Sequence, residues 1–187
     1  SATASLEWFS SICGVASKEL STSLGQSLKK PNSEIFLPYL SGERTPHNDA
    51  TIRGVFMGLN NYSDNVSLTQ AIMEGVTFAL RDNLESLKTT GADLNSLVVL
   101  GGGSSSIYWQ KLISTVLNIA VDIPKEGDFG AAFGAARLGM IAANKVNPYE
   151  VCKAPIIANT IYPQKEFQKS FEEAYQKYKK LYPAISN

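Results

Sequence analysis

The stretch that most constrains this chain is residues 97–106, which read Leu-Val-Val-Leu-Gly-Gly-Gly-Ser-Ser-Ser. Four apolar residues with two β-branched members predict a short strand buried on both faces, although a buried helical segment has the same pattern. The three glycines that follow have no Cβ, so the backbone can turn sharply there and a flat ligand can lie against it. The order predicts a strand that ends in a glycine turn.

A helix is expected directly after this turn. The hydroxyls of Ser104 to Ser106 can cap its first turn, and apolar residues recur at helical spacing through Leu117. A helix N-terminus carries unpaired N–H groups and a partial charge of about +0.5, which suits an anionic ligand such as a nucleotide. Many such turns only connect two elements, and the spacing Gly-x-x-x-x-Gly-Lys-Ser/Thr of a phosphate loop is absent. Both interpretations stay open from the residues alone.

Charge and composition argue against several classes of function. Lys plus Arg and Asp plus Glu both number 17, so nothing indicates a surface for nucleic acid or for an acidic membrane. No apolar run approaches the roughly 20 residues of a membrane span. The single histidine, His47, excludes a site with two histidine ligands. Cys13 and Cys152 have no metal or redox spacing and indicate two reduced thiols in a cytoplasmic protein.

Periodicity and turn residues predict the other elements. Helices are expected at residues 1–12, in a short piece of 15–30, and at 67–88, 129–143 and 164–181; strands are expected at 34–40, 51–59 and 121–123. Residues 144–163 are expected to be a loop because they contain three prolines. The last helix carries an aromatic stripe and is expected to dock on the domain.

Three further expectations concern particular side chains. The polar loop 41–49 permits a catalytic role through Glu43, Arg44, His47 and Asp49, but a solvated loop held by an Arg–carboxylate pair is favoured. Glu74 is expected at the edge of its helix's apolar stripe. The small residues around Gly134 predict a helix packed closely on a neighbour, because each helical glycine costs about 1 kcal/mol relative to alanine. Asp128 is expected to cap that helix.

Five blocks of sequence resemble the C-terminal half of the FGGY family of carbohydrate kinases. They are residues 36–47 (Phe-Leu-Pro-Tyr-Leu-Ser-Gly-Glu-Arg-Thr-Pro-His), 53–59 (Arg-Gly-Val-Phe-Met-Gly-Leu), 74–78 (Glu-Gly-Val-Thr-Phe), 101–109 (Gly-Gly-Gly-Ser-Ser-Ser-Ile-Tyr-Trp) and 130–136 (Gly-Ala-Ala-Phe-Gly-Ala-Ala). The blocks lie in register over about residues 1–143. Five together make a specific signal, whereas any one alone is weak.

The resemblance implies an α/β, actin-like (ribonuclease H-like) ATPase domain with a mixed sheet flanked by helices. It implies that residues 1–187 are the nucleotide-binding C-terminal half of a two-domain sugar kinase, with 147–187 as a closing loop and docking helix. The sugar-binding N-terminal domain is then expected outside this chain, and the first helix, which begins without an initiator Met, agrees with a piece of a longer protein.

The resemblance also implies the site. Gly102 and Gly103 are expected against the adenosine of ATP, with Ser104 to Ser106 alongside and Trp8 flanking the same pocket. Some relatives have a nucleotide-contacting asparagine where this chain has Ile107. The catalytic aspartate is expected in the missing N-terminal half, so no catalytic or metal-binding residue is assigned here.

The implied function is transfer of phosphate from ATP with Mg²⁺ to a pentulose, D-xylulose, giving D-xylulose 5-phosphate. The alternatives are a kinase of the same family for gluconate or another ketose, and a non-catalytic actin-like module that binds nucleotide. ATP and sugar are the expected partners, nucleic acid and membrane are not, and a homodimer stays open. The 187-residue chain alone is expected to be inactive.

Overall fold

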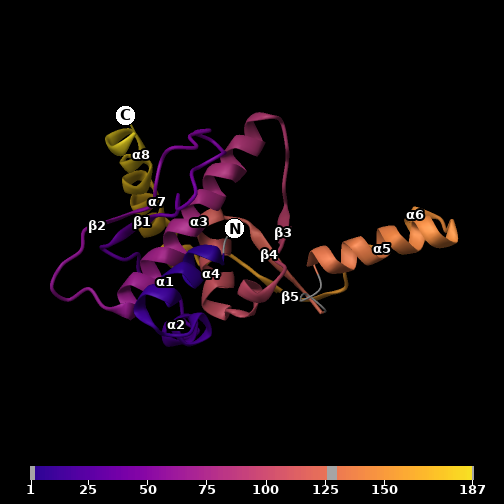
Figure 1. Ribbon diagram of the computed structural model, residues 1–187, viewed down its shortest axis with the longest axis horizontal. Helices are drawn as coiled ribbons and strands as arrows, with labels where there is room; N and C mark the ends of the chain where they lie inside the picture. The colour runs from indigo at the N-terminus through magenta and orange to yellow at the C-terminus, as the bar shows by residue number, and fades with distance from the viewer. Residues whose placement is uncertain (1–2, 126–129, 187) are drawn as a thin grey trace.

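The computed structural model describes residues 3–125 and 130–186 as a body of packed helices and strands with an extended arm (Figure 1). The elements in chain order are α1 (Ala4–Cys13), α2 (Ser17–Ser23), β1 (Ile35–Leu37), β2 (Val55–Met57), α3 (Asn65–Thr89), β3 (Ser96–Val98), the short 3₁₀ helix η1 (Gly102–Ser105), α4 (Ile107–Leu117), β4 (Ala120–Pro124), α5 (Gly130–Asn144), α6 (Pro148–Val151), β5 (Ile157–Ile161), α7 (Lys165–Lys179) and α8 (Leu181–Ile185). The expected α/β class is confirmed, and the order strand, glycine turn, helix is present at β3, η1 and α4.

Helix α3 is the central element of the body, and it contacts β1, α4, α1, α2 and α7. It begins with a capping box: the Asp64 carboxylate accepts from the Ser67 backbone N–H, and the Ser67 hydroxyl accepts from the Asp64 N–H. The helix ends just before Gly91, whose φ of +86° is the left-handed geometry expected of a C-terminal glycine. Both ends of α3 are therefore specified locally.

The described residues form two small sheets. Strands β1 and β2 pair antiparallel, and β3, β4 and β5 form a mixed sheet in which β3 is parallel and β5 antiparallel to β4. The expectation that the residue 97–100 strand is buried on both faces is wrong, because Val98 is 45% exposed and Leu100 is 52% exposed. The reason is position: among the described strands, β3 has β4 as its single neighbour and lies at the edge of the sheet.

The C-terminal segment contains more structure than the three prolines predicted. Residues 144–163 were expected to be a loop, but they include α6 and β5, and β5 pairs with β4 in the register Val121 with Ile161. Helix α7 docks on the body as expected, through Phe171, Tyr175 and Tyr178, which are buried. The Tyr175 hydroxyl donates to the Asp82 carboxylate on α3, so the docking contact also has a polar part.

Helices α5 and α6 extend away from the body as an arm (Figure 1). The predicted close packing of the small residues is contradicted: α5 has no buried residue, and a Cβ added at Gly134 or Gly139 would meet no atom within 4 Å. The arm has its two ends joined at the sheet, where the Lys125 N–H donates to the Ile156 carbonyl oxygen at 2.8 Å. The expected Asp128 cap lies outside the described residues.

The polar loop 41–49 is held by contacts other than those expected. Glu43 accepts a hydrogen bond from the His47 backbone N–H at 2.8 Å, and the His47 ring stacks on Tyr182 with centroids 3.6 Å apart. The predicted Arg–carboxylate pair is wrong for Arg44, because the ion pairs among the described residues are Arg81–Glu172 and Lys88–Glu85. The loop is thus fixed by its own backbone and by α8.

No helix of the described residues is long and apolar enough to cross a membrane.

Candidate functional site

A cleft of about 870 Å³ lies between the α1–α2 hairpin and the glycine turn. Its residues come from three places: the first turns of α1, the length of α2 with the residues after it, and the segment from η1 to the start of α4. They are Thr3, Leu6, Glu7, Ser17, Lys18, Ser21, Thr22, Gly25, Gln26, Gly102, Gly103, Ser105, Ser106, Ile107 and Trp109. The expected glycine turn therefore lines this cleft.

The three glycines have different surroundings. Gly101 has a φ of +87°, which makes the sharp turn after β3, and nothing lies within 4 Å of a Cβ added there. Gly102 also has open space on its Cβ side. A Cβ on Gly103 would instead come within 2.9 Å of the Thr3 methyl group and 3.1 Å of the Trp109 ring. Gly102 thus leaves room for a ligand, while Gly103 permits close packing of the protein itself.

The serines after the glycines line two different cavities. Ser106 lines the cleft and caps α4, because its hydroxyl accepts from the Trp109 N–H at 3.3 Å. Ser104 does not line the cleft; its hydroxyl donates to the Gly101 carbonyl oxygen at 2.6 Å, and it lines a smaller neighbouring cavity of about 300 Å³ that shares Gly102 and Gly103 with the cleft. The structure brings Gly102, Gly103 and Ser106 together in the cleft, but not Ser104.

The aromatic residue at the cleft is Trp109, whereas Trp8 lies elsewhere. The Trp8 ring stacks on Phe36 and Phe56, with centroids 5.9 Å and 6.4 Å away, and is absent from the cleft wall. Thr3, Leu6 and Glu7 face the cleft, because positions three and four apart share one side of a helix, and Trp8 lies off that side. The expected flanking role of Trp8 is therefore not met by this geometry.

Trp109 is fixed from behind by α3. Its indole N–H donates to the Thr77 hydroxyl at 3.1 Å, and that hydroxyl donates to the Met73 carbonyl oxygen at 2.6 Å. Thr77 is fully buried and Trp109 is 4% exposed, so the pair sits in the core under the turn. Sequence reasoning missed Thr77, although the Glu-Gly-Val-Thr-Phe block that contains it was among the residues that carried the family resemblance.

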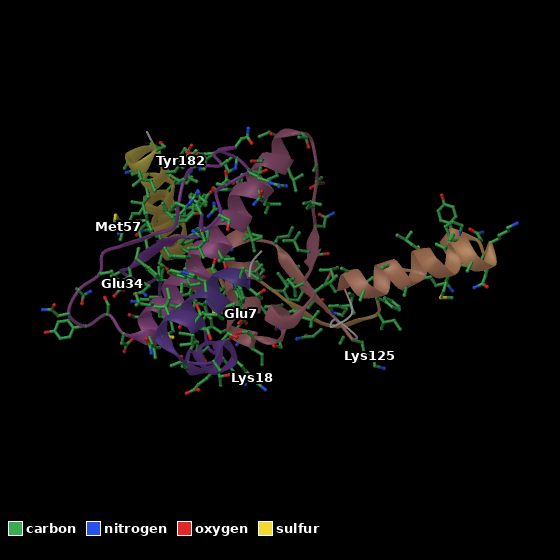
Figure 2. All side chains as sticks on the ribbon, in the orientation of Figure 1. Glu7, Lys18, Glu34, Met57, Lys125 and Tyr182 are labelled. Atoms are coloured by element: carbon green, nitrogen blue, oxygen red, sulfur yellow. The ribbon has the colours of Figure 1, made fainter. Side chains whose placement is uncertain are left out.

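Helix α2 supplies polar groups that the sequence analysis also missed. The Ser17 hydroxyl donates to the Glu7 carboxylate at 2.6 Å, and Lys18, Thr22 and Gln26 line the cleft beside them. Figure 2 shows Glu7 and Lys18 on the neighbouring helices α1 and α2. Only the Ser-rich composition of residues 15–30 could have indicated this wall, and that composition is equally typical of a loop.

The chemistry of the cleft suits a nucleoside phosphate. Hydroxyl and amide groups can bind a base and a ribose, Lys18 supplies a cation, and the N-terminus of α4 supplies partial positive charge. The described residues contain no group of three or more His, Cys, Asp or Glu side chains that could hold a metal ion. A metal at this cleft would depend on oxygen ligands from phosphate, as Mg²⁺ commonly does.

Comparison with known proteins gives the family. The C-terminal domain of the FGGY family of carbohydrate kinases matches residues 3–143. A xylulose kinase of Escherichia coli is 37% identical over 145 residues, which are 77% of this chain and 30% of that protein. In structure, a xyloylose kinase from Brucella ovis matches with a TM-score of 0.88 and 53% identity, covering 98% of this chain and 38% of the other.

A gluconate kinase from Lactobacillus acidophilus also matches, with a TM-score of 0.78 and coverage of 98% of this chain and 38% of that one. Its identity of 22% supports likeness of fold alone. The chain thus covers between 30% and 38% of the length of these three relatives. By the match over residues 3–143, which carries the glycine turn and the cleft, the chain belongs to the FGGY family of carbohydrate kinases.

Proposed function

We propose that this chain is the ATP-binding half of a sugar kinase. The observation that carries the proposal is the cleft between α1–α2 and the N-terminus of α4, where Gly102 leaves open space beside the backbone. A flat adenosine can lie there without meeting a side chain at Gly102. Family membership adds that relatives of this domain are carbohydrate kinases.

The proposed roles follow from the positions in the cleft. Gly102 and Gly103 form the surface against which the adenosine lies, and Ser106 keeps the first turn of α4 in place beside it. Lys18 contributes positive charge for phosphate oxygens. Phosphoryl transfer depends mainly on positioning and charge neutralisation, so these residues bind and orient the nucleotide. Mg²⁺, where bound, neutralises phosphate charge, and we assign it no ligand in this chain.

We propose D-xylulose as the sugar, with D-xylulose 5-phosphate as the product in the cytoplasm, because relatives at 37% and 53% identity are named xylulose or xyloylose kinases. The second candidate is a kinase for gluconate or another ketose, which the likeness of fold to a gluconate kinase allows. We further propose that the sugar site and the catalytic aspartate belong to the part of the relatives that lies outside residues 1–187, and that residues 1–187 alone do not turn over.

Gly102→Val in the natural full-length protein tests the nucleotide site. The added side chain occupies space that is open in the cleft, so affinity for a non-hydrolysable ATP analogue should fall by about 5- to 150-fold, equivalent to about 1–3 kcal/mol. D-Xylulose binding should be unchanged. Gly102 is a cleaner target than Gly103, where a Cβ would push on Thr3 and Trp109 and disturb packing as well.

The measurement is calorimetric titration with the analogue and with D-xylulose, on protein with unchanged thermal midpoint. Gly134→Val is the matched control, because Gly134 also faces open space but lies on the arm. Unchanged analogue affinity in folded Gly102→Val would refute the adenosine position. Titration of the wild-type protein with gluconate distinguishes the two sugar candidates.

A further inference from the structure

Glu74 is a buried carboxyl that the proposed function does not use. It lies on α3, is 3% exposed, and accepts hydrogen bonds from two places. The Asn32 backbone N–H lies 3.0 Å and 3.2 Å from its two oxygens, and the Gln70 amide nitrogen donates to it at 2.8 Å. No cation pairs with it among the ion pairs of the described residues. Burial of a carboxyl is costly unless hydrogen bonds or a paired cation compensate for the lost water, and here the compensation comes from Asn32 and Gln70.

These hydrogen bonds attach the segment of residues 26–34 to α3. The segment lies between α2 and β1 and belongs to no helix or strand, so its backbone groups need partners from elsewhere. Glu74 supplies an acceptor for Asn32, and Gln70 donates to the Lys30 carbonyl oxygen at 2.8 Å. Glu74 and Gln70 also hold each other, so one polar cluster fixes two successive parts of the segment.

The first residue of this segment, Gln26, belongs to the wall of the cleft that lies opposite the glycine turn. Gln26 lines the cleft, and its carbonyl oxygen accepts from the Lys111 amine of α4 at 2.9 Å. Between Gln26 and Asn32, Leu28 is buried in the core. The position of the α2 wall relative to the glycine turn therefore depends on how the segment is attached to α3 at Asn32.

A second buried polar group, Tyr108, lies on α4 next to residues that line the cleft. Tyr108 is fully buried, and its hydroxyl has no hydrogen-bond partner among the described residues. Burial, and then the negative charge of Glu74, raise the pKa of Tyr108. Tyr108 stands between Ile107 and Trp109, which both line the cleft.

The charge environment of Glu74 is unusual for a carboxyl. Burial raises its pKa to about 8, against the lowering effect of the Gln70 and Asn32 hydrogen bonds, and Glu34 raises it further. Glu74 is therefore a buried carboxyl held by specific hydrogen bonds, and it differs in this from a solvated carboxylate on the surface.

We infer that Glu74 is a positioning residue for nucleotide binding: it fixes residues 30–32 on α3 and so sets the separation between the α2 wall and the glycine turn. This inference rests on the proposed function, because it assigns a role in the same cleft. Glu74 does not touch the nucleotide. Its effect passes through the Asn32 N–H and the buried Leu28 to Gln26.

The test uses Glu74→Leu and Glu74→Gln in the natural full-length protein. Leucine removes both acceptor oxygens and leaves the donors of Asn32 and Gln70 unpaired, whereas glutamine keeps one carbonyl oxygen in place. We expect the affinity for a non-hydrolysable ATP analogue to fall about tenfold in Glu74→Leu, which is about 1.4 kcal/mol, and to stay within about twofold in Glu74→Gln.

Asp82→Leu is the matched control, since Asp82 is another buried carboxyl of α3, hydrogen-bonded to Tyr175 of α7 rather than to the cleft wall. It should lower the thermal midpoint about as much as Glu74→Leu without changing analogue affinity. Hydrogen exchange gives a readout that needs no nucleotide: amides of residues 26–34 should exchange faster in Glu74→Leu, and those of α7 should not.

The outcomes separate the inference from the proposed function. If the wild-type protein does not bind the analogue, the proposed function fails, and faster exchange confined to residues 26–34 still supports the attachment by Glu74. If the wild type binds and Glu74→Leu binds equally well, the positioning role is refuted. Loss of affinity in Asp82→Leu as large as in Glu74→Leu would also refute it, because general destabilisation would then explain both.

Discussion

Helices α3 and α5 both carry glycine and alanine at their centres, yet their surroundings are opposite. In α3 the block Glu-Gly-Val-Thr-Phe places Gly75 directly beneath β1, where an added Cβ would overlap the Phe36 carbonyl oxygen. In α5 the block Gly-Ala-Ala-Phe-Gly-Ala-Ala has no buried residue, and Gly134 faces open space. A helical glycine therefore indicates room for a neighbour, but it does not show that this chain supplies one.

The two helices also differ in whether they support the cleft. Around Gly75, α3 presents Glu74 to the segment after α2 and Thr77 to Trp109, so one helical turn supports both walls of the cleft. Around Gly134, the large side chains stay in solvent: Phe133 is 48% exposed and Leu138 is 67% exposed. Substitutions on the two helices should consequently differ in both size and sign.

The largest expected effect is at Gly75. Gly75→Ala adds a methyl group that overlaps backbone of β1, which cannot move without shifting the strand. We expect a loss of about 3 kcal/mol or more in the free energy of unfolding, measured by urea denaturation. A loss below about 1 kcal/mol would show that α3 and β1 can separate easily, and the contrast with α5 would disappear.

The next effect is the pH dependence of Glu74→Gln. Because the pKa of Glu74 is raised to about 8 in the folded protein from an ordinary value of 4.5, folding takes up a proton between these values. Wild-type stability relative to Glu74→Gln should therefore fall as pH rises from about 4.5 to about 8, and level off above.

Thermal midpoints of both proteins across this pH range give the measurement. Asp82, whose pKa is also raised by burial, contributes equally to both proteins and cancels in the difference. A difference in thermal midpoint that stays constant with pH would show that water reaches the Glu74 carboxyl. Helix α3 would then be less tightly packed than described, and its contrast with α5 would be smaller.

The smallest expected effect, and one of opposite sign, is at Gly134. Gly134→Ala in residues 1–187 should stabilise α5 by up to about 1 kcal/mol, because alanine has the higher helix propensity and nothing is within reach of its methyl group. Helix content by circular dichroism during heating measures it. Destabilisation would mean that a neighbour packs on α5 after all, as the sequence pattern had suggested.

Local patterns were sufficient for the parts of the fold that are specified locally. The strand, glycine turn and helix over residues 97–117 follow from apolar spacing, glycine geometry and the Ser106 cap, and the docking of α7 follows from its aromatic stripe. Strand β5 escaped prediction because its stability comes from pairing with β4, a contact between distant residues that three nearby prolines concealed.

The candidate site was predictable in part for the same reason. Gly102 and Ser106 belong to one continuous stretch, so sequence alone placed them together. The opposite wall comes from α2 and from residues held by Glu74, and these reach the cleft only through tertiary contacts. Trp8 shows the limit of a resemblance: the helix is at the cleft, but its rotation brings Glu7 rather than Trp8 to the wall.

The hydrogen bond from Lys125 to the Ile156 carbonyl oxygen has a consequence for how the chain can vary. Since β4 and β5 are antiparallel neighbours joined there, everything between them is topologically the loop of a hairpin. Loop-closure entropy grows only as about (3/2)RT ln n, so the length of this excursion has little influence on pairing of the two strands. Insertions or deletions can therefore accumulate in the arm without changing the register of β4 and β5 or the shape of the cleft.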